Sequence, residues 1–242
     1  MRALRAQTAA ELRLTLRRGE SVLLTVAIPV GLLIFFSTVR VLPHPRSYKA
    51  PVDFLSPGIL SLAIMSTAMV SLGIATGFER QYGVLKRLGA TPLGRARLLA
   101  AKTLSIVVIE VIQGAVLVAV GLLLGWRPGG DPALAVLGAL MATVAFADIG
   151  LLMAGALRAE VTLAAANGLY LVLLLVGGMI FPLSQLPGPL ADVARGLPAG
   201  ALSAVFHGSL SAGASVPARA WAVLAGWAVA APVAAGLAFH WE

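Results

Sequence analysis

The stretch 104-LSIVVIEVIQGAVLVAVGLLL-124 contains one charged side chain, Glu110. A helix rises about 1.5 Å per residue, so this stretch can cross a hydrocarbon core of about 30 Å. The rest of the chain is similar, because 59% of its 242 residues are hydrophobic, only 12% are charged and the mean hydropathy is +0.94. A water-soluble domain needs more polar residues to cover its surface. The sequence therefore predicts an all-α integral membrane protein in one domain.

Five further apolar runs lie on either side of this stretch, at 21–39, 57–77, 133–157, 161–181 and 221–239. Each is long enough to span a bilayer as a helix, which predicts six spans in total. The first run follows a basic leader, but it exceeds a signal-peptide core and no small-x-small cleavage site follows it, so we expect it to be retained. Residues 1–20 carry five arginines among leucines. We expect an amphipathic helix at the membrane surface there, with a disordered basic leader as the alternative.

The basic residues predict the orientation of these spans. Six spans place both termini on one side, and twelve of the eighteen Lys and Arg residues then lie on that side. The positive-inside rule makes this side cytoplasmic. We therefore interpret the net charge of +8 as the basic residues that orient the spans in a lipid bilayer. No nucleic-acid partner is expected. The excess of Arg over Lys is typical of a GC-rich bacterial genome, which indicates a bacterial cytoplasmic membrane.

The sequence gives little support to metal or thiol chemistry. There is no cysteine, which excludes disulfides and thiolate metal ligands. His44, His207 and His240 are scattered along the chain, so they form no recognisable metal-binding pattern. We expect no metal and no cofactor on this chain.

One charged block, 78-FERQYGVLKRLGATPLGRAR-97, interrupts the apolar runs. Its pattern predicts a helix from Glu79 to Leu88, ended by Gly89 in the left-handed conformation. Thr91 is a favourable N-cap and Pro92 suits the first position of a second helix, which leads into the next span. The region 78–102 is therefore expected to form a short cytoplasmic helix, a break and a second helix.

The first of these helices is expected to have an apolar side and a basic side. Tyr82, Leu85 and Leu88 recur at intervals of three residues and would share one apolar side, whereas Lys86 and Arg87 would lie off it. Such a surface suits docking to another protein. A basic loop that only fixes the topology is the alternative interpretation.

This block resembles the loop between the second and third spans of ABC-2 type permeases, the membrane subunits of ATP-driven exporters. The shared pattern is a Glu-Arg pair, a glycine and a final Ala-Thr-Pro, here Glu79, Arg80, Gly83, Ala90, Thr91 and Pro92. The chain departs from the pattern at Gln81 and at Lys86, where acidic residues are common. A basic residue at Lys86 is similar to the drug-exporter branch.

A second resemblance lies in 177-GGMIFPLSQLPGPLADVARGLPAG-200. Family members carry a glycine, a Phe-Pro, a Leu-Pro and a later proline after the fifth span, here Gly178, Phe181, Pro182, Leu186, Pro187, Leu197 and Pro198. The family often has Asn-Pro where this chain has Leu-Pro. Because residues 183–217 are too apolar for a free loop and too interrupted to span twice, we expect a re-entrant segment on the outer side.

The resemblance implies a division of labour between chains. The block 78–102 would dock on a nucleotide-binding subunit and carry its motion into the membrane. This sequence lacks the Gly-x-x-x-x-Gly-Lys-Ser/Thr phosphate loop, so ATP and Mg²⁺ are expected on a partner ATPase, present in two copies. Six spans are half of the usual pathway, so a second copy or a homologous permease is expected as well. The implied cargo is hydrophobic or amphipathic and resembles a drug or a lipid.

Polar residues inside the predicted spans are candidates for a translocation path. Glu110 and Asp148 would lie at similar depths in neighbouring helices, where an ionised group costs about 2.5–3.5 kcal/mol on insertion scales. Gln113 and Asn167 are further candidates, although hydrogen bonding between packed helices explains all four equally well. A carboxylate pair also leaves open an ion-gradient-driven transporter or a membrane-embedded enzyme.

Overall fold

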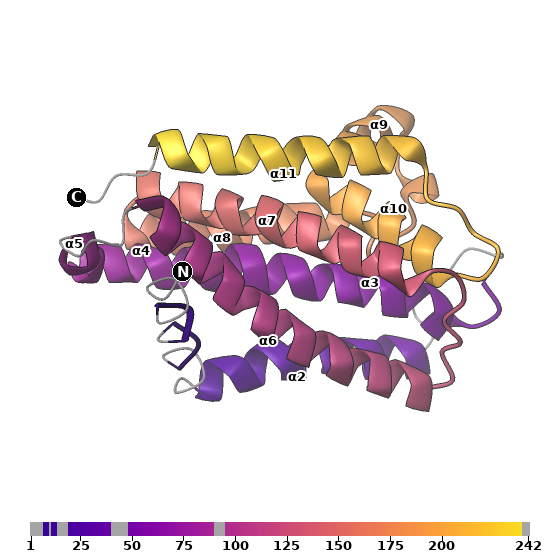
Figure 1. Cartoon of the computed structure of the whole chain (residues 1–242). Coiled ribbons are helices and arrows are strands. Elements are labelled where there is room, and N and C mark those ends of the chain that lie inside the picture. The colour runs from indigo at the N-terminus through magenta and orange to yellow at the C-terminus, as the bar shows by residue number, and fades with distance from the viewer. Residues whose placement is uncertain (1–6, 10, 14–18, 40–47, 90–94, 239–242) are drawn as a thin grey trace.

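The computed structural model describes residues 7–9, 11–13, 19–39, 48–89 and 95–238, and this part of the chain is all-helical (Figure 1). Five of its helices are long and apolar enough to cross a membrane: Pro51–Gln81, Arg97–Leu123, Pro132–Ala156, Ala159–Val176 and Ala218–Ala238. They correspond to five of the six predicted spans. The first predicted span is helix α2 (Gly19–Val39), whose described apolar part, Thr25–Val39, is shorter. The expected surface helix over 1–20 falls mostly outside the described residues.

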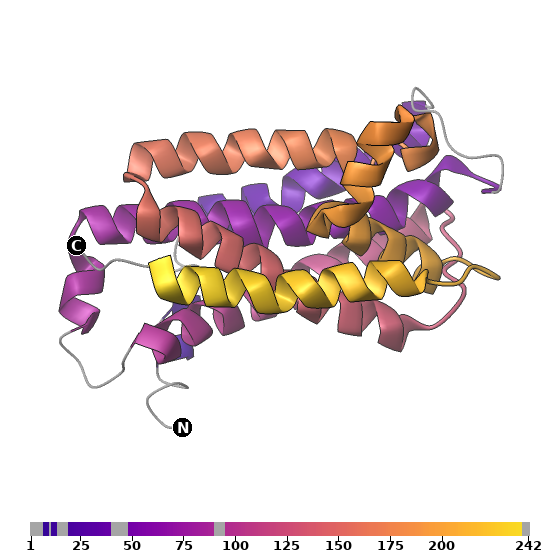
Figure 2. The same cartoon turned by 90° about the horizontal axis from the view of Figure 1, so that it is seen from above.

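The helices run alternately up and down between two ends of the bundle. Figure 1 shows α5 (Val84–Gly89), the connection from α7 (Pro132–Ala156) to α8 (Ala159–Val176), and the C-terminal end of α11 (Ala218–Ala238) together at one end. The start of α3 (Pro51–Met65) and the α10–α11 loop lie at the other end. We call these the α5 end and the α10 end. Figure 2 shows α8 and α11 on the outside of the bundle, apart from each other.

The second span is the central helix of the fold and is longer than expected. It runs from Pro51 to Gln81 as α3, a π-helical segment η1 (Ser66–Ser71) and α4 (Leu72–Gln81). Its side chains form much of the main core, together with α7, α10 (Pro198–Leu210) and α11. Phe146 of α7 is fully buried in this core. Burial on all sides explains why nearly every residue of this helix is apolar or small.

Glycine allows α7 to lie directly against the π-helical segment. A Cβ added to Gly150 would lie 2.5 Å from the carbonyl oxygen of Met69, and one added to Gly73 would lie 3.0 Å from the carbonyl oxygen of Gly150. Contacts this short are possible only for residues without a side chain. The two helices therefore cross backbone to backbone near the middle of the bundle.

The fifth span is shorter than predicted. Helix α8 ends at Val176, and Gly178 follows with φ of +72°. This left-handed conformation favours glycine and turns the chain out of the helix. The predicted extension to Phe181 is therefore wrong. The glycine pair, which the sequence analysis included in the span, marks its end.

The prolines of the second motif each begin a helix. Pro182 precedes the short 3-10 helix η2 (Leu183–Gln185), Pro187 precedes α9 (Gly188–Gly196), and Pro198 is the first residue of α10. A proline needs no hydrogen-bond partner for nitrogen and has the φ of a helix start. Phe181, Leu186 and Leu197 are the residues before these prolines. The motif thus encodes a sequence of short helices.

Most of residues 183–217 pack onto the bundle. Most of α10 is buried against α3, α7 and α11, and the Trp227 indole of α11 donates to the Gly196 carbonyl of α9 at 3.0 Å. Helix α10 is also joined to α3 at the α10 end, where the ring of His207 lies 3.0 Å from the Phe54 carbonyl. This is a packed helical segment. Its predicted re-entry into the bilayer stays a prediction.

Candidate functional site

Three consecutive residues at the end of α4 bind three different parts of the protein. Glu79 accepts a hydrogen bond from Lys102 at the start of α6 (Arg95–Leu123). Arg80 donates to backbone carbonyls at the end of α7, and Gln81 donates to Glu160 of α8 at 2.9 Å. We call Glu79, Arg80 and Gln81, together with Lys102 and Glu11, the α4 polar cluster. It ties five segments together at the α5 end of the bundle: the N-terminal segment, α4, α6, α7 and α8.

The ion pairs in this cluster are largely buried. Lys102 Nζ lies 2.5 Å from Glu79 Oε2 and 3.1 Å from Glu11 Oε2, and the Lys102 side chain is 2% exposed. A buried ammonium is tolerated when opposite charges surround it. One lysine therefore joins the N-terminal segment, the second span and the third span.

Arg80 caps the C-terminal end of α7. Its guanidinium donates to the carbonyls of Gly155 and Leu157, the latter at 3.0 Å. The last carbonyls of a helix lack partners within the helix and carry partial negative charge, which a cation neutralises. The Glu-Arg pair of the motif thus makes contacts within the chain. Its role in coupling to an ATPase stays a prediction.

The predicted helix from Glu79 to Leu88 is interrupted. Helix α4 ends at Gln81, and α5 begins at Val84 after a turn in which Gly83 has φ of +69°. The left-handed glycine that the sequence analysis expected at Gly89 thus occurs six residues earlier. Helix α5 itself extends to Gly89. The motif glycine, Gly83, is the residue whose conformation requires glycine.

This turn separates residues that were expected to share a face. Tyr82 is 71% exposed, whereas Leu85 is completely buried. Leu85 therefore packs inside the protein, and its predicted contact with a partner is wrong for this conformation. Lys86 and Arg87 are exposed on α5. The Leu88 side chain, Thr91 and Pro92 lie outside the described residues.

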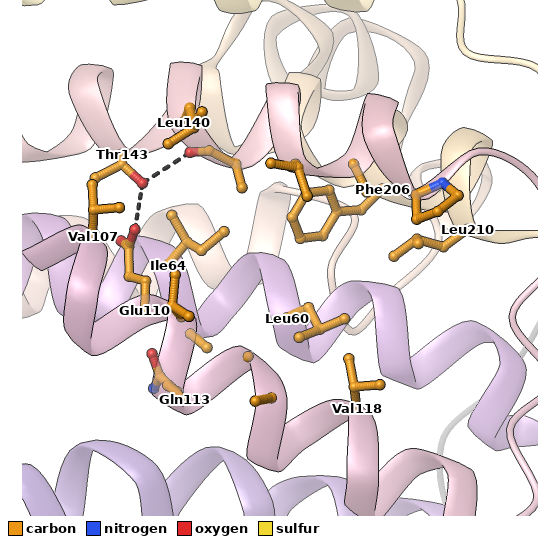
Figure 3. Close-up of a pocket in the computed structure, with 18 of the residues that line it drawn as sticks. Leu60, Ile64, Val107, Glu110, Gln113, Val118, Leu140, Thr143, Phe206 and Leu210 are labelled. Carbon is orange, nitrogen blue, oxygen red and sulfur yellow. Dashed lines mark hydrogen bonds between the residues drawn. The ribbon is translucent and has the colours of Figure 1, made fainter.

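A cavity of about 360 Å³ lies deeper in the bundle, between α6 and α7. Its walls are mostly apolar and come from α3, α6, α7 and α10 (Figure 3). Val111 of α6 and Val136 of α7 line it and are 66% and 60% exposed on the outside of the chain. We call this the α6–α7 cavity. It lies beside an exposed apolar surface of the bundle.

Two of the predicted pathway residues line this cavity. The Oε2 atom of Glu110 lies 2.5 Å from the Thr143 hydroxyl of α7, whereas its buried Oε1 atom has no partner among the described residues. Gln113 donates to the Thr25 carbonyl of α2 at 2.7 Å and accepts from Thr67 of η1 at 3.0 Å. Gln113 thus joins helices, as a packing role requires. Glu110 is the group with unused hydrogen-bonding capacity.

The other two candidates lie elsewhere. Asp148 is 8% exposed but does not line the α6–α7 cavity, because it follows Thr143 by five residues, which places it on another side of α7. Asn167 is exposed on α8 and donates to the Leu163 carbonyl of its own helix at 2.8 Å. The expected patch of Glu110 with Asp148 is not formed by the described residues.

A second cavity of about 580 Å³ lies at the α10 end. Polar side chains line it, among them Lys49, Asp53 and Arg127. Trp126 and Leu210 line both cavities and therefore form the boundary between them. The apolar cavity thus borders a polar one that lies toward the end of the bundle.

Two functional candidates escaped the sequence analysis. Lys102 enters the sequence argument only through the count of basic residues that predicts the topology, and Thr143 is not singled out by any pattern. A signal for Lys102 was present: Glu79 ends one span and Lys102 begins the next, so opposite charges lie at the same membrane border. Thr143 had no such signal, since its importance depends on facing Glu110.

Comparison with known proteins identifies the family. Residues 2–199 match the ABC-2 type transporter family. A relative named "Putative transport permease YvfS", from Bacillus subtilis strain 168, is 26% identical over 208 residues, which cover 82% of this chain and 81% of that protein. These matches agree with the multi-pass helical fold and with the two motifs. The chain therefore belongs to the ABC-2 type transporter family, whose members are membrane-embedded transport permeases that work with an ABC ATPase.

Proposed function

We propose that this chain is the permease subunit of a bacterial ABC exporter that moves a hydrophobic or amphipathic, drug-like or lipid-like compound out of the cytoplasm or inner leaflet. ATP would be hydrolysed, with Mg²⁺, on a separate ATPase present in two copies. A second copy of this chain, or a homologous permease, would complete the pathway. Helix α2, the first predicted span, would bring the total to six, since its 21 residues rise about 31 Å. Both termini and α5 would then lie in the cytoplasm.

The observation that carries this proposal is the surface beside the α4 polar cluster. Tyr82 and Val84 are exposed apolar side chains, and Lys86 and Arg87 are exposed basic ones on the same short segment. Apolar anchors supply most of the energy of a protein interface, and charges tune the encounter. The neighbouring residues Glu79 to Gln81 bind α6, α7 and α8. A force applied to α5 would therefore reach three spans through one turn.

Co-purification of the chain with its ATPase tests this proposal. Tyr82→Ala should weaken binding of the ATPase by about 1 kcal/mol or more, since it removes an exposed aromatic anchor. It should leave the thermal stability of the permease unchanged, because the side chain has few partners within the chain. ATP-driven uptake of an amphipathic dye into inverted vesicles should fall in parallel with binding.

The matched control is Val193→Ala, which removes an apolar side chain that is 60% exposed on α9 at the opposite end. It should bind the ATPase like the parent chain. If Tyr82→Ala and Val193→Ala both behave like the parent, the α5 surface is not the docking site. Uptake that proceeds without ATP but collapses with the ion gradient would support the ion-gradient-driven transporter instead.

A further inference from the structure

Glu110 is placed to recognise a ligand in the α6–α7 cavity. It projects from α6 into a space whose other walls are almost entirely apolar (Figure 3). Glu110 is the single titratable residue among those that line the cavity. The other lining side chains with polar groups are those of Gln113, Thr143 and Trp126. A buried polar atom normally has a partner, and leaving one without costs about 1–3 kcal/mol. The Oε1 atom of Glu110 has none among the described residues.

The hydrogen bonds of Thr143 show how Glu110 is accommodated in an apolar cavity. The Thr143 hydroxyl lies 2.5 Å from Glu110 Oε2 and 2.8 Å from the Ala139 carbonyl. A hydroxyl carries one proton, and a carbonyl accepts only. Each contact can be a full two-centre hydrogen bond when the carboxyl carries a proton and donates it to Thr143, which leaves the Thr143 proton for the Ala139 carbonyl. The side chain is then uncharged, as an apolar site favours.

We propose that the α6–α7 cavity binds a lipophilic cation, with the positive charge against Glu110 and the apolar body against the walls. This inference rests on the proposed function, because it names the class of cargo. On binding, the O–H bond of the carboxyl breaks, its proton leaves to water, and the carboxylate faces the cation. One positive charge replaces another, so the cavity holds no net charge before or after binding.

The size and walls of the cavity fit such a ligand. A volume of about 360 Å³ lies in the range of about 300–1,000 Å³ that is typical of small-molecule sites. Phe206 and Trp126 are among the lining residues, and aromatic rings attract cations as well as apolar groups. The exposed rim at Val111 and Val136 allows entry from the bilayer, where a lipophilic cation accumulates.

Binding of two ions of the same shape and opposite charge tests the proposal. The chain is placed in lipid nanodiscs without any ATPase, and equilibrium dialysis measures tetraphenylphosphonium and tetraphenylborate above the background of empty nanodiscs. Tetraphenylphosphonium should bind saturably, and tetraphenylborate should not. In weakly buffered solution, about one proton should be released for each tetraphenylphosphonium bound.

Three variants locate the site. Glu110→Gln should weaken tetraphenylphosphonium binding at least tenfold and abolish proton release. Asp148→Asn removes a buried carboxyl outside the cavity and should change neither. Ala139→Phe fills the cavity from α7 while leaving Glu110 in place, and should remove binding. If Glu110→Gln fails to fold, Ala139→Phe and the comparison of the two ions still test the proposed site.

Parental affinity in Glu110→Gln, or equal binding of the two ions, would overturn the inference. The failure of this inference and of the proposed function can be told apart. Glu110-dependent binding without any ATP-driven transport would remove the exporter function and keep the cation site. ATP-driven transport of neutral amphiphiles, with no tetraphenylphosphonium binding, would do the reverse.

Discussion

Glu79 and Glu110 both carry a carboxyl group in a membrane protein, but their surroundings differ. Glu79 lies in the α4 polar cluster, where the Lys102 ammonium binds it at 2.5 Å and cationic Arg80 is its neighbour in sequence. Glu110 lies in the α6–α7 cavity, where one of its oxygens has no partner among the described residues. The first carboxylate is used to hold segments together. The second retains a free acceptor, which is the property that a binding group needs.

The largest expected effect in this comparison comes from Lys102→Met. It would remove the ammonium that contacts both Glu11 and Glu79, and removing one partner of a buried ion pair costs about 3–5 kcal/mol of folding stability. Denaturant titration in mild detergent would measure this loss. Lys49→Met, at an exposed lysine near the α10 end, should change stability by no more than about 0.5 kcal/mol. Equal losses in the two variants would show that the buried ion pairs do not hold the cluster together.

A smaller effect is expected for Arg80→Lys. The charge is kept, but one ammonium cannot reach both carbonyls as the planar guanidinium does. Losing one charged hydrogen bond should cost about 1.5 kcal/mol and should weaken stimulation of the partner ATPase by cargo. Arg97→Lys makes the same change at an exposed position of α6 and serves as the control. If both variants are as stable as the parent, Arg80 does not cap α7.

The smallest effect on stability should come from Glu110→Gln. The amide has the shape of the carboxyl and still meets Thr143, so we expect a loss below about 1 kcal/mol. The same substitution at Glu79 removes a charged partner of Lys102 and should cost at least about 1.5 kcal/mol. Thermal unfolding of the two variants side by side sharpens the comparison. A Glu110→Gln variant that loses more stability than Glu79→Gln would reverse it.

Five of the six predicted spans correspond to long apolar helices, because hydropathy over about 20 residues depends on local composition. The sequence predicted the contacts of the motif residues poorly. Lys102 and Glu11 are 91 residues apart, and Arg80 binds carbonyls more than 70 residues away. Periodicity cannot reveal contacts over such separations. A helical pattern also hid the turn at Gly83, so Leu85 was expected on the surface although it is buried.

The candidate cavity was predicted in part. A charged residue within an apolar span draws attention by itself, so Glu110 was found. The expected patch with Asp148 does not form among the described residues, because similar depth in two helices does not place two side chains on facing sides. The side of a helix on which a residue lies depends on how that helix packs, and the pairing of Glu110 with Thr143 reflects this packing. The prolines of the second motif each begin a helix, and their predicted place in an outer re-entrant segment stays a prediction.

The π-helical segment Ser66–Ser71 sets the angular phase of the second span. In a π turn the N–H donor lies five residues after the carbonyl acceptor, whereas in an α turn it lies four residues after it, so the segment acts like one inserted residue. Each residue of an α-helix adds about 100° of rotation. Everything after the segment, including Glu79, Arg80 and Gln81, is thus turned by about that angle relative to α3. A shortening by one residue here would keep the helix and its hydropathy but aim these three side chains away from α6, α7 and α8. The number of residues in this span therefore determines the direction in which Glu79, Arg80 and Gln81 point, as well as whether the helix is long enough to cross the bilayer.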